Sequence, residues 1–526
     1  MNRTLLFFKK YRWALLSGVL MGTSYIPLPP WAIAFCWVPL WWDLITNTRS
    51  LKEAFIKGWW TQFLLTLIGF HWISHVAHEF AFFPWPIALA TLFLFAALAH
   101  LYIPVAAVLA VWLRGRFALS AGVVAVLLAC FQNLGEAFWP SIFSWNLGYP
   151  LLWIHSGWAQ WGDVIGFLGL SFLVHLINSQ LTWALLNRKS RKAWMSVGVT
   201  ALLVAALGLT GLGRGDKWQG QDSFKATLVQ ANIGNLEKIY AEKGVGYQRS
   251  ILERYFSLSR QAVEADPGTQ LLIWPESAVP EYLDAHNTQR RYAQLFFDGV
   301  RDVNRDLFTG AYSNDTPETR PREDYNGIFL FDGQGRALGP SYHKTNLLIF
   351  GEYAPLGHLF PILRKWNPGG EGFGRGSGPM TYDWQGLKIG PQICYDSLYP
   401  NFSRNLTLQG ADVMINLTND SWFGPRFEPE QHLYMTLARA IENRRPLLRS
   451  TNTGISTVIE ATGFEHVQSP KFQEWFHTYE VKYLKNAGLT FYTRFGAFLS
   501  LIPLLVVGLL LGINARGTSR LERNSH

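Results

Sequence analysis

Cysteine and charge are both scarce in this 526-residue sequence. Only three cysteines occur, Cys36, Cys130 and Cys394, and their spacing leaves Cys394 with no partner for a disulfide bond in its own part of the chain. Charged residues make up 16% of the chain, whereas hydrophobic residues reach 49% and tryptophan occurs 23 times. This composition excludes an ordinary soluble protein and indicates a chain with one part in lipid and another in water.

The apolar residues are concentrated in 1–213 and 495–514, while 225–484 has the mixed charge and turn residues of a water-soluble domain. A membrane-spanning helix needs roughly 20 mostly apolar residues. Eight stretches approach that length, near 13–28, 30–46, 56–74, 85–112, 118–134, 160–187, 194–212 and 495–514. We therefore expect a bundle of about seven spans, an extramembrane domain and a final span. The segment "SYIPLPPW" between the first two stretches is either a tight turn or a break in a re-entrant hairpin.

The short loops predict the orientation, because Lys and Arg accumulate on the cytoplasmic side of a membrane. Basic residues precede the first stretch and follow the second, fourth, sixth and eighth, but none occurs in 75–84 or 134–159. Both termini are therefore expected in the cytoplasm and the large domain outside, which in a bacterium is the periplasm. The net charge of +9 then reflects topology, and no nucleic-acid partner is expected.

The large domain alternates strand-like and helix-like segments, which is typical of a layered α/β sheet. Expected strands lie within 225–233, 269–277, 306–313, 325–333, 387–395, 411–420, 445–454 and 455–463, and expected helices within 247–265, 286–304 and 428–443. In such folds reactive groups collect where strands end.

Three of the loops that follow apolar segments carry reactive side chains. "LLIWPES" ends a strand with Pro275 and Glu276, "HKTNLLIFGEYAP" carries Lys344 and Glu352, and "QICYDS" carries Cys394. A free thiol has a pKa near ~8.5, so a base such as Glu276 must take its proton before the sulfur can attack. Lys344 would stabilise the thiolate and an oxyanion, with the backbone N–H after Cys394 as a second donor, and Glu352 would hold the lysine.

Two alternatives stay open at this point. Cys394 alone could be a buried core residue, which is the expected role of Cys36 and Cys130 within apolar stretches. A Cys–His pair is disfavoured, because His343 is the one histidine in these loops.

A Glu after "WP", a Lys eight residues before the Glu of "FGEYAP" and a Cys in "ICYDS" together resemble the Glu-Lys-Cys triad of the nitrilase superfamily. Such a domain placed between seven spans and a final span resembles the apolipoprotein N-acyltransferase family, as do "NLTNDSWFG" and "QHLYMTLARAIENRRPLLRSTNTG". The resemblance implies a multi-span α-helical membrane domain and an α/β nitrilase-like domain built as an αββα sandwich.

The resemblance also implies an activity. An acyl chain passes from a phospholipid to the thiol of Cys394, forming a thioester, and then to the α-amino group of the diacylglyceryl-cysteine of a lipoprotein. Glu276 is the base and acid, Lys344 supports the oxyanion, and Glu352 assists. The partners are a phospholipid donor and a diacylglyceryl apolipoprotein acceptor, the location is the bacterial inner membrane, and the protein is expected to be a monomer.

Further residues follow from the same resemblance. Tyr395 and Asp396 match positions that support the nucleophile, and Asp396 stands where some relatives have Glu. Trp422, Phe423 and the apolar loop 357–366 are expected to contact lipid, because a two-chain lipid leaves the bilayer at a cost of about 0.8 kcal/mol per CH₂.

No cofactor and no metal are expected. The glycine-rich segment 369–378 imitates a dinucleotide-binding loop without the required strand and helix, and a flap near the site is the better interpretation. His75, His78 and Glu79 have a metal-compatible spacing at the end of an apolar stretch, where polar residues are ordinary.

Two rival functions use the same residues. In a membrane-anchored nitrilase-like amidase or hydrolase, water would resolve the acyl-enzyme. In a transporter or scaffold with an inactive domain, Cys394 would be dispensable.

Overall fold

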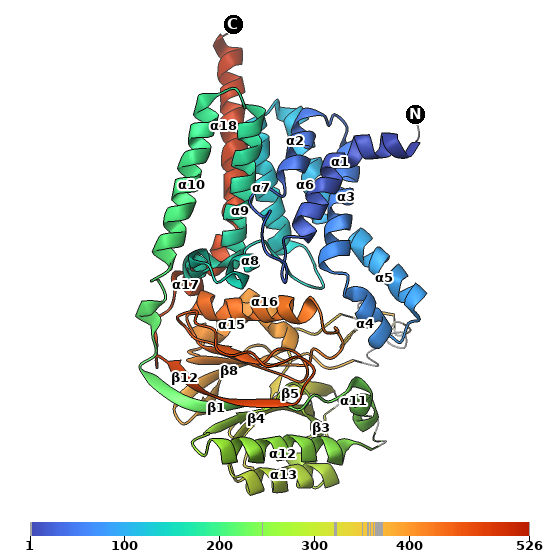
Figure 1. Cartoon of the computed structure of the whole chain (residues 1–526), viewed down its shortest axis with the longest axis vertical. Coiled ribbons are helices and arrows are strands. Elements are labelled where there is room, and N and C mark those ends of the chain that lie inside the picture. Colours follow the sequence, from blue (N-terminus) through green and yellow to red (C-terminus); the bar gives the residue numbers. More distant parts are fainter. Residues whose placement is uncertain are drawn as a thin grey trace. The chain divides into compact units, whose positions relative to one another are not determined.

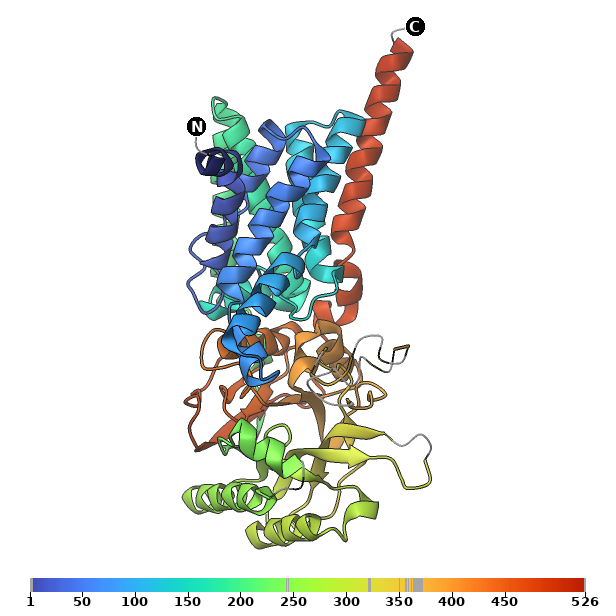
Figure 2. The ribbon, with the colours of Figure 1, turned by 90° about the vertical axis from the view of Figure 1, so that its right-hand side faces the viewer.

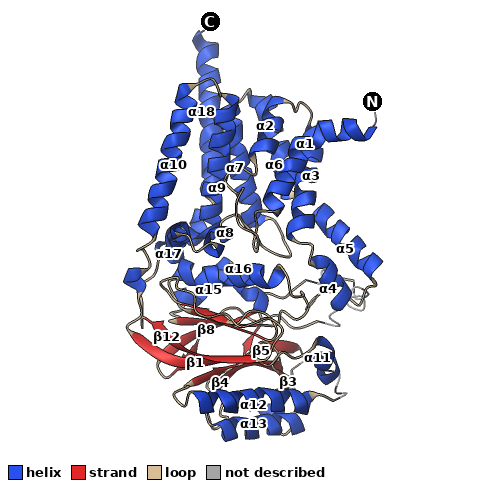
Figure 3. Cartoon of the chain, in the orientation of Figure 1, coloured by secondary structure: helices blue, strands red, loops and turns tan. Residues whose placement is uncertain are grey.

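The computed structural model describes residues 3–242, 244, 246–319, 323–349, 351–354, 357, 359, 360, 362 and 372–524. They form two compact units. The helical unit contains the chain up to His78, Phe83–Arg214 and the chain from Arg494 onward, and the sheet unit contains Glu79–Phe82 and Gly215–Thr493. Every strand drawn in Figure 3 belongs to the sheet unit.

The helical unit is built from helices that pack along one another. They are α1 (Arg3–Gly22), α2 (Val38–Thr46), α3 (Leu51–Gly69), α4 (Ile73–Glu79), α5 (Trp85–Leu98), α6 (Tyr102–Phe117), α7 (Ala121–Phe138), α8 (Tyr149–Trp153), η1 (Gly157–Trp161), α9 (Gly162–Leu186), α10 (Arg191–Gly211), α17 (Phe491–Leu499) and α18 (Ile502–Asn524). Helices α7 and α18 are far apart in the sequence but lie side by side (Figures 1 and 2).

Within the described residues, four helices are long and apolar enough to cross a membrane. They are Trp85–Phe117, Ala121–Phe138, Gly157–Leu186 and Arg191–Trp218. The pair α17 and α18, bent by 47°, becomes a fifth if it forms one span. Helices α1 and α3, of 20 and 19 residues, are not among these, so their crossing of the membrane stays a prediction.

The second predicted span differs from expectation. Only Val38–Thr46 of the stretch 30–46 forms a helix, and turns occupy the residues before it. Pro39 fits this start, because proline lacks the backbone N–H that a helix interior requires but is tolerated in the first turn, where it lies in α2.

The sheet unit contains two mixed sheets. The seven-stranded sheet has the order β12-β1-β2-β4-β5-β6, with β3 beside β4, and the five-stranded sheet has the order β11-β10-β9-β8-β7. The strands of the first are β1 (Asp222–Gln230), β2 (Leu271–Ile273), β3 (Val279–Tyr282), β4 (Asp306–Asn314), β5 (Asp324–Phe331), β6 (Tyr342–His343) and β12 (Trp475–Tyr483). Those of the second are β7 (Tyr382–Trp384), β8 (Leu387–Ile393), β9 (Val413–Thr418), β10 (Leu447–Thr451) and β11 (Thr457–Ile459).

Helices cover the outer faces of the two sheets (Figures 1 and 3). Helices α12 (Gln248–Ala265) and α13 (Arg291–Val303) cover the first sheet, and α15 (Pro400–Leu408) and α16 (Glu428–Asn443) cover the second. This is the expected αββα sandwich. The helix α11 (Asn235–Glu242) follows β1.

Helical periodicity explains how α12 and α13 cover their sheet. On α13 the buried residues Ala293, Phe296, Val300 and Val303 recur every three or four positions. They join a core centred on Trp274, whose ring stacks on Tyr255 at 4.9 Å between centroids. Trp274 directly follows β2, so this packing also fixes the strand end that leads to Glu276.

Candidate active site

Three strand ends carry the acid, the amine and the thiol that the sequence singles out. Glu276 lies shortly after β2, Lys344 directly follows β6, and Cys394 directly follows β8 as the first residue of η4 (Cys394–Leu398). The structure places Glu276 and Lys344 in contact, although β2 and β6 are not neighbours in the sheet.

The ammonium group of Lys344 lies between two carboxylates. Its Nζ is 3.1 Å from Oε1 of Glu276 and 2.8 Å from Oε1 of Glu352. The side chain of Lys344 is 2% exposed, so solvent screens these ion pairs little.

Three further donors orient the two carboxylates. The Asn326 Nδ2 group donates to Oε1 of Glu276 at 2.8 Å and to Oε1 of Glu352 at 3.2 Å. The backbone N–H of Asn419 donates to Oε2 of Glu276 at 2.9 Å, and that of Leu348 donates to Oε2 of Glu352 at 2.9 Å. Both carboxylates are therefore held in one orientation before a substrate arrives.

A close backbone approach fixes the loop of Glu276. The N–H of Gly310 donates to the carbonyl of Pro275 at 3.2 Å. A Cβ at Gly310 would lie 2.8 Å from the Cα of Glu276 and 2.6 Å from the N of Ser277. Only glycine allows β4 to pass this close to the loop.

The nucleophile candidate sits in a strained turn. Cys394 has φ of +45°, a conformation that non-glycine residues adopt mainly where the surrounding structure enforces it. Its carbonyl accepts hydrogen bonds from Ser397 Oγ at 2.9 Å and from Asn416 Nδ2 at 3.3 Å. The turn ends strand β8 abruptly and is held from two sides.

The electrostatics of the site favour a protonated thiol beside a charged lysine. Burial raises the pKa of Cys394 well above its ordinary value, and the charge of Glu276 raises it further, whereas Lys344 opposes both. Burial alone would lower the pKa of Lys344, but the carboxylates of Glu276 and Glu352 outweigh it and leave that pKa well above its usual range. Lys344 alone would favour a thiolate, but the other effects outweigh it. Cys394 is therefore expected to be a thiol before the substrate binds, and it must lose its proton during the reaction.

Asp396 lies beneath the nucleophile rather than in contact with solvent. It accepts hydrogen bonds from Tyr342 Oη at 2.6 Å, from the Asn346 backbone N–H at 2.8 Å and from the Ile393 backbone N–H at 3.1 Å. Burial raises the pKa of this carboxyl to about 6. Asp396 thereby ties the turn of Cys394 to the segment that carries Lys344.

Of the aromatic candidates, Tyr395 is buried, whereas Trp422 and Phe423 are half-buried. The ring of Tyr395 packs edge-on against Tyr399 at 5.3 Å. The ring of Trp422 packs edge-on against Phe80 at 5.1 Å, within the sheet unit. Phe423 is half-buried beside it in the sequence, and contact of Trp422 and Phe423 with lipid stays a prediction.

The predicted lipid loop 357–366 lies mostly outside the described residues. The described Leu359, Phe360 and Ile362 are all more than half exposed. The glycine-rich segment 369–378 is described from residue 372 onward.

The described part of that segment is tied to the site. The N–H of Gly376 donates to the carbonyl of Lys344 at 2.8 Å, and the N–H of Phe373 donates to the carbonyl of Glu352 at 2.9 Å. A Cβ at Gly376 would come 2.0 Å from the carbonyl oxygen of His343. Gly376 lets the backbone approach the segment that carries the lysine.

The remaining histidine candidates have other partners. His343 stacks on Tyr325 at 4.0 Å and bonds Ser313 through Nε2 at 2.8 Å. His78 bonds the carbonyl of Phe83 and stacks on Trp85. In the described part of the chain, potential metal ligands gather at Asp420, Glu428 and His432, a group that does not include His75, His78 or Glu79.

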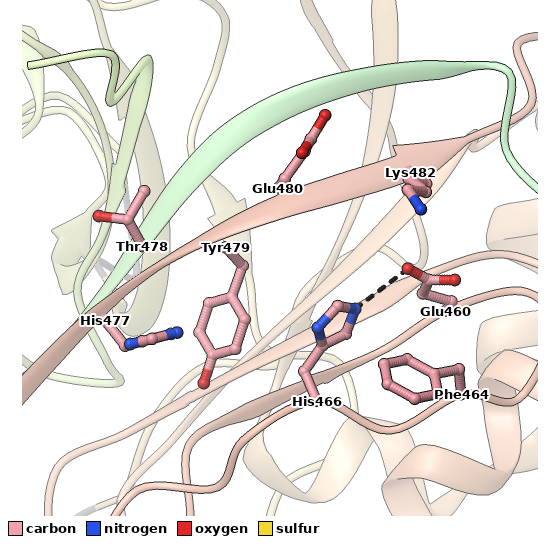
Figure 4. Close-up of a pocket in the computed structure, with 8 residues that line it drawn as sticks. All are labelled: Glu460, Phe464, His466, His477, Thr478, Tyr479, Glu480 and Lys482. Carbon is pink, nitrogen blue, oxygen red and sulfur yellow. Dashed lines mark hydrogen bonds and ion pairs between the residues drawn. The ribbon is translucent and has the colours of Figure 1, made fainter. Parts of the chain in front are cut away.

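A hollow of about 500 Å³ lies elsewhere in the sheet unit (Figure 4). Tyr479 separates His477 from His466, which pairs with Glu460 at 3.1 Å (Figure 4). Its lining residues are Glu460, Phe464, His466, His477, Thr478, Tyr479, Glu480 and Lys482, and none of them belongs to the cluster around Lys344.

Sequence reasoning missed Asn326 and Asn419. Asn326 lies within β5, and Asn419 directly follows β9. A polar residue in an otherwise apolar strand, as in "YNGIFLF", was the available signal for Asn326.

Two family models match the chain. The carbon-nitrogen hydrolase model matches residues 204–481, and the model of the apolipoprotein N-acyltransferase N-terminal domain matches residues 17–180. Among solved structures, Saccharomyces cerevisiae Nit3, a member of branch 10 of the nitrilase superfamily, covers 50% of this chain and 91% of its own at 18% identity and a TM-score of 0.39. An amidase from Nesterenkonia sp. covers 49% of this chain and 90% of its own at 19% identity and a TM-score of 0.35.

Curated relatives match over nearly the full length. A protein of Bdellovibrio bacteriovorus is 49% identical over 98% of this chain and 97% of its own, and a protein of Geobacter metallireducens is 32% identical over 93% and 92%. Both are named apolipoprotein N-acyltransferase. With these relatives and both family models, the chain belongs to the apolipoprotein N-acyltransferase family.

Proposed function

We propose that this protein transfers an acyl chain from a membrane phospholipid to the α-amino group of the diacylglyceryl-cysteine of a lipoprotein, through a thioester on Cys394. The observation that carries the proposal is the contact of one buried ammonium, Lys344, with both Glu276 and Glu352, whose charges act on the free thiol of Cys394. Family membership supplies the reaction class, and this cluster supplies the groups that the reaction requires.

In the first half-reaction Glu276 takes the proton of the Cys394 thiol as the sulfur attacks the ester carbonyl of the phospholipid. The oxyanion that forms is stabilised by the ammonium of Lys344, which its two carboxylate neighbours keep charged. The C–O bond then breaks, and Glu276 returns the proton to the leaving oxygen of the lysophospholipid. The product is a thioester on Cys394.

In the second half-reaction the α-amino group of the acceptor attacks the thioester carbonyl. Glu276 accepts the proton of the attacking amine, the C–S bond breaks, and the proton returns to the sulfur of Cys394. Glu352 keeps Lys344 in place in both steps, since it accepts a hydrogen bond from the ammonium at 2.8 Å. These two half-reactions require no cofactor.

The proposed setting follows the charge pattern of the loops. The protein would lie in the bacterial inner membrane as a monomer, with both termini in the cytoplasm and the domain 225–484 in the periplasm. The apolar helices Trp85–Phe117 and Arg191–Trp218 support membrane insertion by their length and composition.

The test mixes the purified protein with acyl-labelled phospholipid and a synthetic diacylglyceryl peptide. Label on the peptide amine supports the proposal, whereas label released only as free fatty acid supports a hydrolase instead. Cys394→Ala should abolish the transfer. Cys36→Ala and Cys130→Ala are matched controls, because both are buried thiols of the helical unit and should keep the activity.

A further inference from the structure

Four buried polar side chains form a cluster beside the strand ends of the site. Asp420 follows β9, Glu428 and His432 lie on α16, and Arg449 lies on β10. His432 Nδ1 is 3.1 Å from Oδ1 of Asp420 and 3.3 Å from Oε1 of Glu428, and Arg449 Nη2 is 2.9 Å from Oδ2 of Asp420. Each of these side chains is at most 2% exposed.

One branch of the cluster leads to the base. Asp420 is the next residue after Asn419, whose backbone N–H donates to Oε2 of Glu276 at 2.9 Å. Because Arg449 and His432 hold the two oxygens of Asp420, they also fix the position of the Asn419 amide.

A second branch leads to the nucleophile. Arg449 Nη1 donates to Asn416 Oδ1 at 2.9 Å, and the Nδ2 group of the same Asn416 donates to the carbonyl of Cys394 at 3.3 Å. Arg449 Nη1 also approaches Thr436 Oγ1 at 3.3 Å. That hydroxyl bonds Ser397 Oγ at 2.7 Å, which in turn donates to the Cys394 carbonyl.

Two alternative roles fit less well. Burying several charged groups is a poor route to stability, because desolvation offsets most of the attraction between them. A bound cation would be repelled by the guanidinium of Arg449, which already occupies Oδ2 of Asp420. The space around Asp420 is also specific, since a Cβ at Gly454 would come 2.0 Å from Oδ2.

We propose that Asp420 and Arg449, held by His432, are positioning residues that set the separation of Glu276 and Cys394 for acyl-enzyme formation. The proposal rests on the proposed function of Cys394. The cluster touches no reacting atom, but it keeps the base and the nucleophile at the correct distance from each other. A displacement of about 1 Å can cost about 10²-fold in rate.

The cluster also acts on the thiol through its charge. The charges of Glu276, Lys344, Asp420 and Glu352 act on the thiol of Cys394, and the negative charge of Asp420 raises the pKa of the thiol. Removing that charge should therefore make the thiol easier to deprotonate, while the disturbed geometry slows acylation.

The experiment measures two rates in the full-length protein. One is acyl-enzyme formation from phospholipid, and the other is alkylation of Cys394 by iodoacetamide as a function of pH, both followed by mass spectrometry. Asp420→Asn should slow acylation about 10- to 100-fold and move the alkylation midpoint to lower pH. Arg449→Lys keeps the charge but loses the fork that contacts Asn416 and Asp420 together, so it should slow acylation with little change in the midpoint.

Arg439→Lys is the matched control, because Arg439 is an equally buried arginine that pairs with Glu442 on α16. It should keep the wild-type acylation rate. Wild-type acylation rates in Arg449→Lys and Asp420→Asn would overturn the positioning role, and if Asp420→Asn does not fold, Arg449→Lys decides. If the wild type forms no acyl-enzyme, the proposed function is overturned instead. The two failures can be told apart, because iodoacetamide alkylates Cys394 whether or not the protein reacts with phospholipid.

Discussion

Replacing Lys344 with Met tests the charge arrangement of the site most severely. The substitution keeps the length of the side chain and removes the ammonium that contacts Glu276 and Glu352 at 3.1 and 2.8 Å. Because both carboxylate oxygens contact the same Nζ, they lie at most about 6 Å apart. At an effective dielectric constant of about 20 their repulsion is about 3 kcal/mol.

This repulsion affects both stability and rate. Without the ammonium the two buried carboxylates repel each other, and the loss of a buried ion-pair partner typically costs about 3–5 kcal/mol. Loss of the cation near the oxyanion adds about 10²–10³-fold in rate. We therefore expect Lys344→Met to form acyl-enzyme at least about 10²-fold more slowly and to unfold at a lower temperature.

The assay is the rate of acyl-enzyme formation in excess phospholipid, with thermal unfolding in detergent measured alongside. The double variant Lys344→Met/Glu352→Gln removes one of the repelling charges, so it should regain part of the stability but not the rate. Acylation by Lys344→Met within about threefold of the wild-type rate would refute the reasoning, since that difference is under 1 kcal/mol.

Three further predictions concern the surroundings of the site. Gly310→Ala should slow acylation, because its Cβ would collide with the loop of Glu276, whereas Gly327→Ala on the adjacent strand, with no neighbour of its Cβ closer than 3.3 Å, should not; equal rates would contradict this. Asn326→Asp adds a carboxylate where an amide donates to Glu276 at 2.8 Å, and should slow acylation about tenfold or more in a single-turnover assay. The pKa of Asp396 is raised to about 6 in the folded protein, so its contribution to stability is present at low pH and is lost as the pH rises through 6. Relative to wild type, Asp396→Asn should gain about 2 kcal/mol of unfolding free energy between pH 4 and 7, and a pH-independent difference would contradict the shift.

The sequence predicts the strand ends before Glu276 and Cys394 because apolar strands followed by polar residues are a local signal. The strands that lead to Glu276 and Cys394, and helices such as α12 and α16, lie within the expected segments. Strands β3, β6 and β7 have two to four residues, too few for a periodic pattern, so they were not expected. Their existence depends on pairing with distant strands.

The supporting residues of the site escape prediction for the same physical reason. Asn326 and Asn419 act through contacts with Glu276, which is far away in the sequence. The residues next to them in the chain give no sign of this contact. Arg449 and Asp420 likewise meet only through the pairing of β9 with β10. Tertiary contacts, which local patterns do not encode, decide these positions.

The central claim is tested most directly by mass spectrometry of the purified protein after exposure to phospholipid in the absence of an acceptor. The account predicts the added mass of one acyl chain on the peptide that contains Cys394, sensitive to hydroxylamine and lost when a diacylglyceryl peptide is added. A protein that acylates the peptide while its Cys394 thiol stays unmodified at every time point would contradict the account.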